Sequence, residues 1–265
     1  MITEKLFDSH AHYFDERFDD LADKILTEEV FGKNVGKVIN VGTNNKNNLT
    51  CLEQARKYEN MYVALGIHPD DCQYCEKSPD EEVAELERLI MSERESGKIV
   101  AIGEIGYDFH YEGFDKEKQR EFFELQMQLA KKLSLPVCIH DREAHGPCFD
   151  MALAYPEVKG VFHSYSGSAE MARELVKRGW YISFSGVLTF KNAERVREVA
   201  ASVPLENILI ETDAPYLAPH PFRGKLNHSG LTEYTATTLA EVKGITPDEA
   251  ARITYENAER LFFGN

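Results

Sequence analysis

The chain has 265 residues, 43% of them hydrophobic, which is enough to bury the core of one large domain or two small ones. Its 45 acidic residues outnumber its 30 lysines and arginines, and the net charge of −15 disfavours unassisted attraction to phosphates or anionic membranes. A nucleic-acid partner would therefore need local cations. Five cysteines are too few for a disulfide scaffold and indicate a reducing compartment.

The start of the chain and its hydropathy bear on its location. Residues 1–5 show no charged segment leading into an apolar one, as a signal peptide would, and nowhere do about 18 apolar residues run together. We therefore expect a cytoplasmic protein without a membrane partner. Nothing in the sequence implies an oligomer.

From the N-terminus onward, short apolar segments alternate with segments of helical periodicity. The first strand is expected to end at 5–7, and a helix is expected over 14–31. Seven further strands are predicted at 37–43, 61–67, 99–103, 136–140, 160–163, 180–184 and 208–211. The helices between them are expected at 47–58, 79–96 and 115–133, and then in segments ending at 154, 178 and 201. Residues 231–263 would form the last helical layer, with Thr246 and Pro247 opening its second helix.

This alternation predicts the fold class. Short, almost wholly apolar strands separated by helices are typical of parallel strands that are buried on both faces. Eight such units favour an α/β fold of the closed (β/α)8 TIM-barrel type over an open doubly wound sheet. No dinucleotide-binding glycine motif follows the first strand, and no linker or low-complexity tract divides the chain. We expect residues 1–265 to form a single domain.

Polar side chains gather where the predicted strands end, which is where such barrels build their active sites. Side chains of a strand alternate between its faces, so Asp8, His10 and His12 share one face. Glu211 and Asp213 are in phase for the same reason. The residues at strand ends are His10, His12, His68, Glu104, His140, Arg142, His163, Glu211 and Asp213.

One layer of this site can hold four imidazoles and two carboxylates, namely His10, His12, Glu104, His140, His163 and Asp213. The set exceeds the needs of one tetrahedral ion and fits two divalent ions that share a carboxylate. Imidazoles suit zinc or manganese, whereas carboxylates and phosphate oxygens admit magnesium, so the metal stays open among Mg, Mn and Zn. Two such ions, about 3.5–4 Å apart, clamp the attacking and leaving oxygens in hydrolysis, especially of phosphate esters.

Six motifs, in order along nearly the whole chain, resemble the TatD family of metal-dependent deoxyribonucleases. They are Asp8-Ser9-His10-Ala11-His12, Gly66-Ile67-His68-Pro69, Gly103-Glu104-Ile105-Gly106-Tyr107-Asp108, Cys138-Ile139-His140-Asp141-Arg142, Phe162-His163-Ser164-Tyr165-Ser166-Gly167 and Glu211-Thr212-Asp213-Ala214-Pro215-Tyr216-Leu217. The resemblance implies an amidohydrolase-like TIM barrel that hydrolyses DNA phosphodiesters with divalent cations.

The resemblance also implies roles for single residues. His10, His12 and Asp213 would hold one metal ion. Glu104 would bridge to a second ion, held by His140 and His163. His68 corresponds to a residue near the substrate phosphate. Arg223-Gly224-Lys225 matches a basic family motif, although the following Leu226-Asn227-His228-Ser229 departs from the commoner Arg-Asn-Glu-Pro continuation.

Other roles are interpreted from the residues themselves. Asp213 is either a metal ligand that also accepts a proton or a helix N-cap residue. Glu211 is expected to orient a metal ligand by contacting it, and Asp8 is expected either to do the same or to lie at the floor of the barrel. Arg142 either clamps a phosphate or pairs with a neighbouring acid, and Arg223 with Lys225 could contact a strand backbone. The aromatic residues considered for base stacking, with core packing as the alternative, are Tyr107, Phe109, Tyr165 and Tyr216.

The leading hypothesis is a deoxyribonuclease that uses two divalent ions, with Asp213 and Glu104 as catalytic residues and Arg142, Arg223 and His68 contacting substrate. The acidic charge favours DNA ends or single strands as substrates over duplex coating. One alternative is an amidohydrolase-like enzyme that acts on a small amide, lactone or aminoacyl ester. A second alternative is a metal-dependent binding protein without catalysis.

Overall fold

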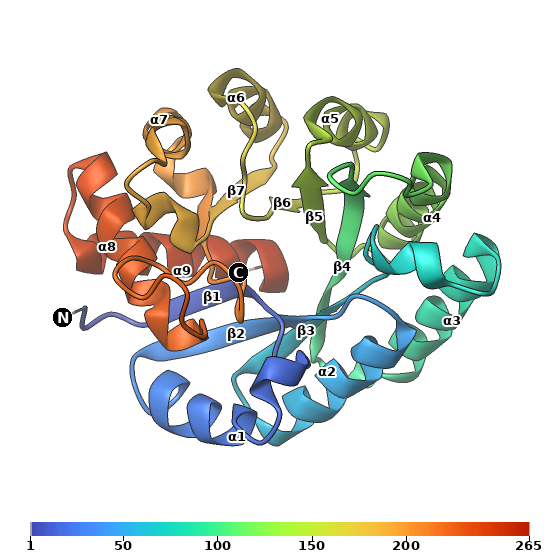
Figure 1. The fold of residues 1–265 in the computed structure, drawn as a ribbon, viewed down its shortest axis with the longest axis horizontal. Helices are drawn as coiled ribbons and strands as arrows, with labels where there is room; N and C mark the ends of the chain where they lie inside the picture. The colour runs from blue at the N-terminus through green and yellow to red at the C-terminus, as the bar shows by residue number, and fades with distance from the viewer. Residues whose placement is uncertain (1, 265) are drawn as a thin grey trace. The chain divides into compact units, whose positions relative to one another are not determined.

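The computed structural model describes residues 2–264, and all of the strands described there belong to one sheet in chain order (Figure 1). The eight strands within this range are β1 (Leu6–Ala11), β2 (Val35–Val41), β3 (Met61–Leu65), β4 (Ile99–Asp108), β5 (Val137–Arg142), β6 (Gly160–Phe162), β7 (Tyr181–Phe184) and β8 (Ile208–Ile210). With helices between the strands, the predicted (β/α)8 fold class is confirmed.

The helices follow the strands along the chain, as in β–α units (Figure 1). They are α1 (Ala22–Lys24), α2 (Asn45–Lys57), α3 (Pro79–Ser92), α4 (Lys116–Leu133), α5 (His145–Ala154), α6 (Ala169–Lys177), α7 (Glu194–Ser202), α8 (Thr232–Lys243) and α9 (Pro247–Phe263). Thr246 caps α9 by accepting a hydrogen bond from the Glu249 N–H at 3.2 Å, as its sequence predicted. No helix within residues 2–264 is long and apolar enough to cross a bilayer. The cytoplasmic location stays a prediction.

The chain divides into two compact units. The described residues of Met1–Asn40 and His163–Asn265 form unit 1, and Val41–Phe162 form unit 2. The expectation of a single domain over 1–265 stays a prediction.

Unit 1 is built on parallel strands whose apolar side chains are buried. β1 pairs with β2 in the register Asp8 to Val38, and β7 pairs with β8 in the register Ile182 to Ile208. All six residues of β1 are buried, and the Phe7 ring meets Tyr255 of α9 edge to face at 5.5 Å between centroids. The closely packed β1 therefore gives a rigid base for the histidines at its end.

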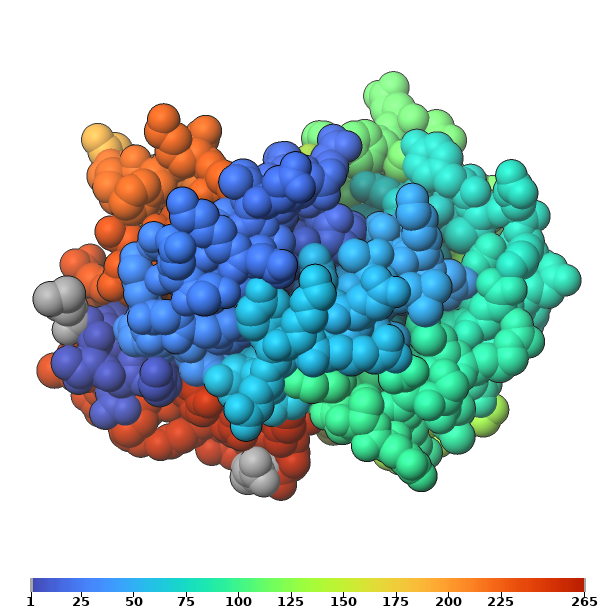
Figure 2. Space-filling model, turned by 90° about the horizontal axis from the view of Figure 1, so that it is seen from below, coloured from blue at the N-terminus to red at the C-terminus, as the bar shows by residue number. Residues whose placement is uncertain are grey.

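Unit 2 contains the parallel strands β3 to β6 in consecutive order, with the registers Ala64 to Ala101, Ile105 to Ile139 and Val137 to Gly160. Its outer surface carries helices, and Figure 2 shows α2 and α3 side by side on it in light blue to turquoise. Helix α3 begins with a capping box between Ser78 and Glu81.

Three predicted elements differ clearly from the structure. The first strand, expected to end at 5–7, is β1 and runs to Ala11. The expected helix over 14–31 is broken into a 3-10 turn (Glu16–Phe18), the short α1 and a π-helical segment (Ile25–Val30). Asp20 has a positive φ of 60°, which a right-handed helix cannot continue through. β4 runs five residues beyond its predicted end at 103 because Gly106 lets the strand pass close to β5, where a Cβ would lie 2.0 Å from the His140 carbonyl oxygen.

Candidate metal centre

In unit 1, three potential ligand atoms of His10, His12 and Asp213 point at one another. The two Nε2 atoms lie 3.1 Å apart, and Asp213 Oδ1 lies 3.3 Å from His12 Nε2 and 4.0 Å from His10 Nε2. Ligand atoms around a tetrahedral ion with bonds of ~2.0–2.2 Å are themselves ~3.3–3.6 Å apart. The three residues therefore fit one metal ion with little rearrangement.

Backbone pairing brings these ligands together. The end of β1 continues as a parallel bridge between Ala11 and Ala214, the residue after Asp213. The Asp213 N–H donates to the His10 carbonyl at 2.9 Å, and the His12 N–H donates to the Ala214 carbonyl at 2.6 Å. The two strand ends are thus locked in the register that sets Asp213 beside the histidines, and the N-cap interpretation of Asp213 is wrong because no helix follows it directly.

Asp213 has an unusual backbone and a charged environment. Its φ of 56° is left-handed, a conformation that aspartate tolerates better than most residues. Burial alone would raise the pKa of its carboxyl, but the hydrogen bond with His12 and the charge of His163 outweigh it and hold the pKa below its ordinary value. The carboxylate is therefore ionised at neutral pH, as a metal ligand must be.

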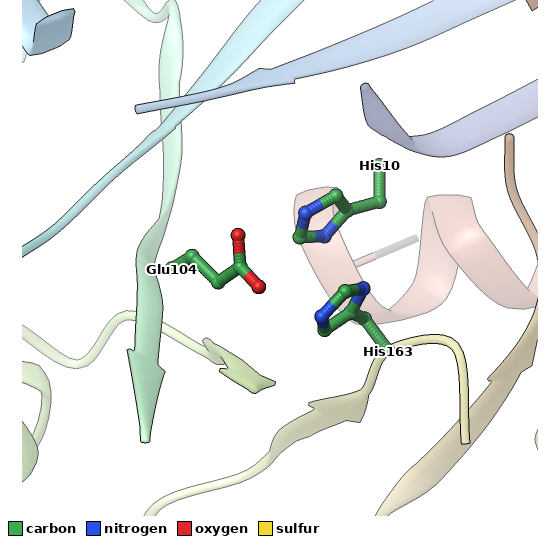
Figure 3. Close-up of side chains that lie close together, drawn as sticks. All are labelled: His10, Glu104 and His163. Atoms are coloured by element: carbon green, nitrogen blue, oxygen red, sulfur yellow. The ribbon is translucent and has the colours of Figure 1, made fainter. Parts of the chain in front are cut away.

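His163, which directly follows β6, also belongs to unit 1. Its ring stacks on that of His10 at 4.0 Å between centroids, and Figure 3 draws the two rings face to face. The buried Glu211 holds Oε1 3.3 Å from His163 Nδ1. A carboxylate on Nδ1 fixes the ring and leaves Nε2 for a metal, so the geometry agrees with the ligand-orienting role expected of Glu211.

Asp8 stands behind this group and is completely buried. It accepts hydrogen bonds from the Thr212 N–H at 2.9 Å and the Thr212 hydroxyl at 2.5 Å, which tie β1 to the residue before Asp213. Burial raises the pKa of Asp8 to about 7 against these hydrogen bonds. Asp8 thus ties the backbone of β1 to that of Thr212 and does not itself join a candidate ligand group of the described chain.

Asn227 is a supporting residue that the sequence reasoning missed. It is fully buried, and its Nδ2 donates to the carbonyls of Thr212 at 2.9 Å and Tyr216 at 2.6 Å. These bonds span the turn that carries Asp213. The sequence shows an asparagine two residues after the basic motif. It does not show which carbonyls this amide contacts, because they lie 11 and 15 residues away in the chain.

Unit 2 has a candidate group of its own, made of His68, Glu104 and His140. Glu104 Oε1 lies 2.6 Å from His140 Nδ1 and 3.6 Å from His68 Nε2. The rings of His68 and His140 meet edge to face at 4.3 Å. His68, which the family resemblance assigns to the neighbourhood of the substrate phosphate, thus shares a potential ligand group with Glu104.

Asp108 is the second residue that the sequence reasoning passed over. It lies at the end of β4, buried, with Oδ2 3.1 Å from His140 Nε2 and 3.7 Å from an Arg142 nitrogen. Burial would raise its pKa, but the hydrogen bonds from His140 and from the His110 backbone outweigh burial and lower it. The half-exposed Arg142 guanidinium also lies 5.4 Å from the centre of the Tyr111 ring.

Two buried glutamines of α4 fix the backbone of this group. Gln126 exchanges two hydrogen bonds with Ile67, the residue before His68, at 2.7 and 3.0 Å. Gln119 does the same with Asp108 at 3.1 and 2.8 Å. Helix α4 therefore holds the ends of β3 and β4 in position by amide contacts that hydrophobic patterning does not predict.

Burial bears on the roles of several aromatic residues and cysteines. Tyr107 and Tyr165 are buried, so for them the packing alternative holds, whereas Tyr216 is 46% exposed. Cys72 and Cys75 are free thiols, and burial raises their pKa values to about 12 and about 11.

Comparison with known proteins agrees with this fold. Residues 7–263 match the family model of TatD related DNase. The chain is 39% identical to YabD of Bacillus subtilis, an uncharacterized metal-dependent hydrolase, over 97% of this chain and 98% of YabD. YcfH of Escherichia coli K12, also an uncharacterized metal-dependent hydrolase, is 34% identical over 97% of this chain and 95% of YcfH. The crystal structure of YjjV, a TatD homologue from E. coli K12, matches with a TM-score of 0.89 at 30% identity, covering 97% and 98% of the two chains.

A (β/α)8 fold whose strand ends carry histidines and carboxylates in metal-ligand spacing defines the class of metal-dependent TIM-barrel hydrolases. The chain belongs to the TatD family of these hydrolases.

Proposed function

We propose that this protein hydrolyses DNA phosphodiester bonds with two divalent ions. The observation that carries the proposal is the spacing of His10, His12 and Asp213, whose ligand atoms lie 3.1 to 4.0 Å apart in unit 1. These residues would hold the first ion. Glu104 would bridge to a second ion held by His140 and His163. Mg, Mn and Zn are all compatible with such ligands.

When bound, the two ions would supply Lewis-acid polarisation of the scissile phosphate and activation of the attacking water. Asp213 would accept the proton of that water, because its carboxylate is held ionised beside His12. Glu211 would keep the His163 ring oriented through its contact with Nδ1. Glu104 would contact both ions, so its replacement should lower the cleavage rate more than replacement of any single histidine.

The phosphate would be steadied by Arg142, Arg223 and His68. Arg142 is suited to this because its guanidinium is 45% exposed and only loosely paired with Asp108 at 3.7 Å. His68 would act either there or as a ligand in the group that it forms with Glu104 and His140. The net charge of −15 supports engagement of strand ends or single strands, which present few phosphates at a time.

The experiment is a cleavage assay on protein stripped of metal with a chelator. A fluorescent single-stranded oligonucleotide is expected to be cut only after a divalent ion is added, and faster than a circular duplex. Glu104→Gln and Asp213→Asn are expected to lose about 100-fold or more in kcat/KM. Glu121→Gln, on the exposed face of α4, is the matched control and is expected to cleave like the parent.

The same assay separates the alternative substrates. If the metal-loaded protein turns over an amide, lactone or aminoacyl ester while leaving DNA intact, the proposed substrate is wrong. If Glu104→Gln and Asp213→Asn cleave DNA as fast as Glu121→Gln, the proposed roles of both carboxylates are wrong.

A further inference from the structure

Unit 1 contains a second functional feature beside the His10, His12 and Asp213 group. It is a cavity of about 510 Å³, which we call the 223 pocket and which Arg17, Phe190, Leu217, Arg223, Lys225 and Leu226 line together with neighbouring backbone. Its volume lies within the range of about 300–1,000 Å³ that is usual for small-molecule sites. Pro215, two residues after Asp213, also lines it, so the pocket is built from the same loop as the metal ligand.

The charges in the 223 pocket are unusual for so acidic a chain. Within residues 2–264, neither Arg223 nor Lys225 forms an ion pair with a carboxylate, whereas cations elsewhere, such as Arg120 and Arg178, do. Arg17, by contrast, is bound through two nitrogens to the Asp15 carboxylate at 2.8 Å each. The pocket therefore contains two cationic side chains without a carboxylate partner, and an anionic ligand would supply the missing negative charge.

The two cations are held in place. The Arg223 guanidinium lies over the Phe190 ring at 4.1 Å from its centre, a stacking contact that leaves the edge of the guanidinium open for bidentate hydrogen bonds. Gly224 has a φ of 79°, and the turn is closed by a 2.9 Å hydrogen bond from Lys225 N–H to the Phe222 carbonyl. This left-handed turn brings the residues on both sides of Gly224 to the same pocket.

The remaining lining is apolar and comes from Pro215, Leu217, Ala218 and Leu226. One side thus suits a phosphate, and the other suits a sugar and base. Tyr216 lies between this loop and Arg17, which covers its ring at 4.0 Å. A pocket with a cationic end, an apolar wall and the volume of a single small ligand matches one nucleotide better than a free anion.

We propose that the 223 pocket binds one nucleotide of the substrate strand next to the scissile bond, with its phosphate at Arg223 and Lys225. The inference rests on the proposed function, since it assigns part of the substrate of the same site. Such a pocket would select strand termini or unpaired segments, because the base of a nucleotide inside a duplex is covered by the stacked neighbouring bases and by its pairing partner.

Isothermal titration of thymidine 5′-monophosphate into the full-length, chelator-treated protein tests the inference. We expect one binding site whose Kd rises about tenfold or more in Arg223→Gln and in Lys225→Gln. Arg195→Gln, which removes an equal charge from the exposed face of α7 in the same unit, is the control and is expected to bind like the parent. Phe190→Leu keeps every charge but removes the ring under Arg223, and is also expected to weaken binding.

Two further ligands identify what the pocket recognises. Thymidine, which lacks the phosphate, is expected to bind far more weakly than the monophosphate. If inorganic phosphate binds as tightly as the monophosphate, the pocket takes a free anion and the nucleotide assignment is wrong. Equal weakening by Arg195→Gln would also overturn it, because the effect would then reflect overall charge.

The outcomes separate this inference from the proposed function. If DNA is cleaved but binding of the monophosphate is unaffected by all three pocket variants, the pocket assignment is wrong and the hydrolase proposal stands. If the monophosphate binds as expected but no divalent ion supports DNA cleavage, the pocket stands and the proposed reaction is wrong.

Discussion

Asn227 Nδ2 lies 2.9 Å from the carbonyl oxygen of Thr212, although the two residues are 15 positions apart in the chain. This hydrogen bond holds the turn that contains Asp213. Asn227 is fully buried, so no water can take over its bonds without opening the structure. The position of a candidate metal ligand thus depends on an amide that is not itself in a candidate ligand group.

Replacing Asn227 with alanine should loosen this turn. Two carbonyls lose their donor, and we expect metal affinity to fall by about 10- to 100-fold, as for other residues that support ligands. A competition titration with a fluorescent chelator measures it. Asn192→Ala, an exposed amide, is the control and should bind metal like the parent. Unchanged affinity in Asn227→Ala would mean that the backbone alone fixes Asp213.

Glu211→Gln tests how His163 is oriented. The neutral amide still fills the space 3.3 Å from Nδ1 but no longer favours a proton there, so the ring loses its fixed tautomer. We expect about 10-fold or greater loss of affinity for one of the two ions, measured by metal content after dialysis. Glu206→Gln, an exposed acid, should keep the parent's content. A parent-like content in Glu211→Gln would contradict the assigned role.

Gly106→Ala should destabilise unit 2 strongly. The new Cβ would lie 2.0 Å from the His140 carbonyl oxygen, and φ at this position is 144°. We expect a loss of about 3 kcal/mol or more in the free energy of unfolding, measured by urea titration. Gly146→Ala in α5 meets no atom within 4 Å and should be neutral or stabilising by up to ~1 kcal/mol. Equal effects of the two changes would refute the steric argument.

The Asp15–Arg17 pair gives a prediction about pH. Hydrogen bonding from Arg17 lowers the pKa of Asp15 from 3.8 to about 2. A carboxyl with a lowered folded pKa stabilises the fold above its unfolded pKa and loses that contribution as the pH falls through the folded value. Asp15→Asn should therefore be less stable than the parent at pH 6, by less than about 1 kcal/mol because solvent screens the 44% exposed Arg17 side chain, and most of this difference should be lost by pH 2. A difference that persists at pH 2 would point to the capping of Glu16–Phe18 as its cause.

The fold follows from the sequence because eight apolar segments and their spacing leave few alternatives. Errors arose where local backbone geometry decides. Asp20 breaks the expected helix at 14–31 through a positive φ, and Gly106 allows a strand to continue where glycine usually ends one. Neither feature changes the pattern of apolar and polar residues from which the elements were predicted.

The ligand candidates were also accessible from the sequence, since histidines and carboxylates at strand ends stand out against apolar strands. Asn227, Gln119 and Gln126 were not, because a buried amide is recognised only by the carbonyls that it contacts. The place of Asp108 beside His140 likewise required the register of β4 against β5.

The central claim is that two ions, shared through Glu104, cleave DNA. The most direct test is the rate of cleavage of a single-stranded oligonucleotide as a function of the number of Mn²⁺ ions bound per chain. The account predicts little cleavage with one ion, a steep rise as the second binds, and no such rise in Glu104→Gln. Full activity with a single ion bound, or intact DNA with two, would contradict it.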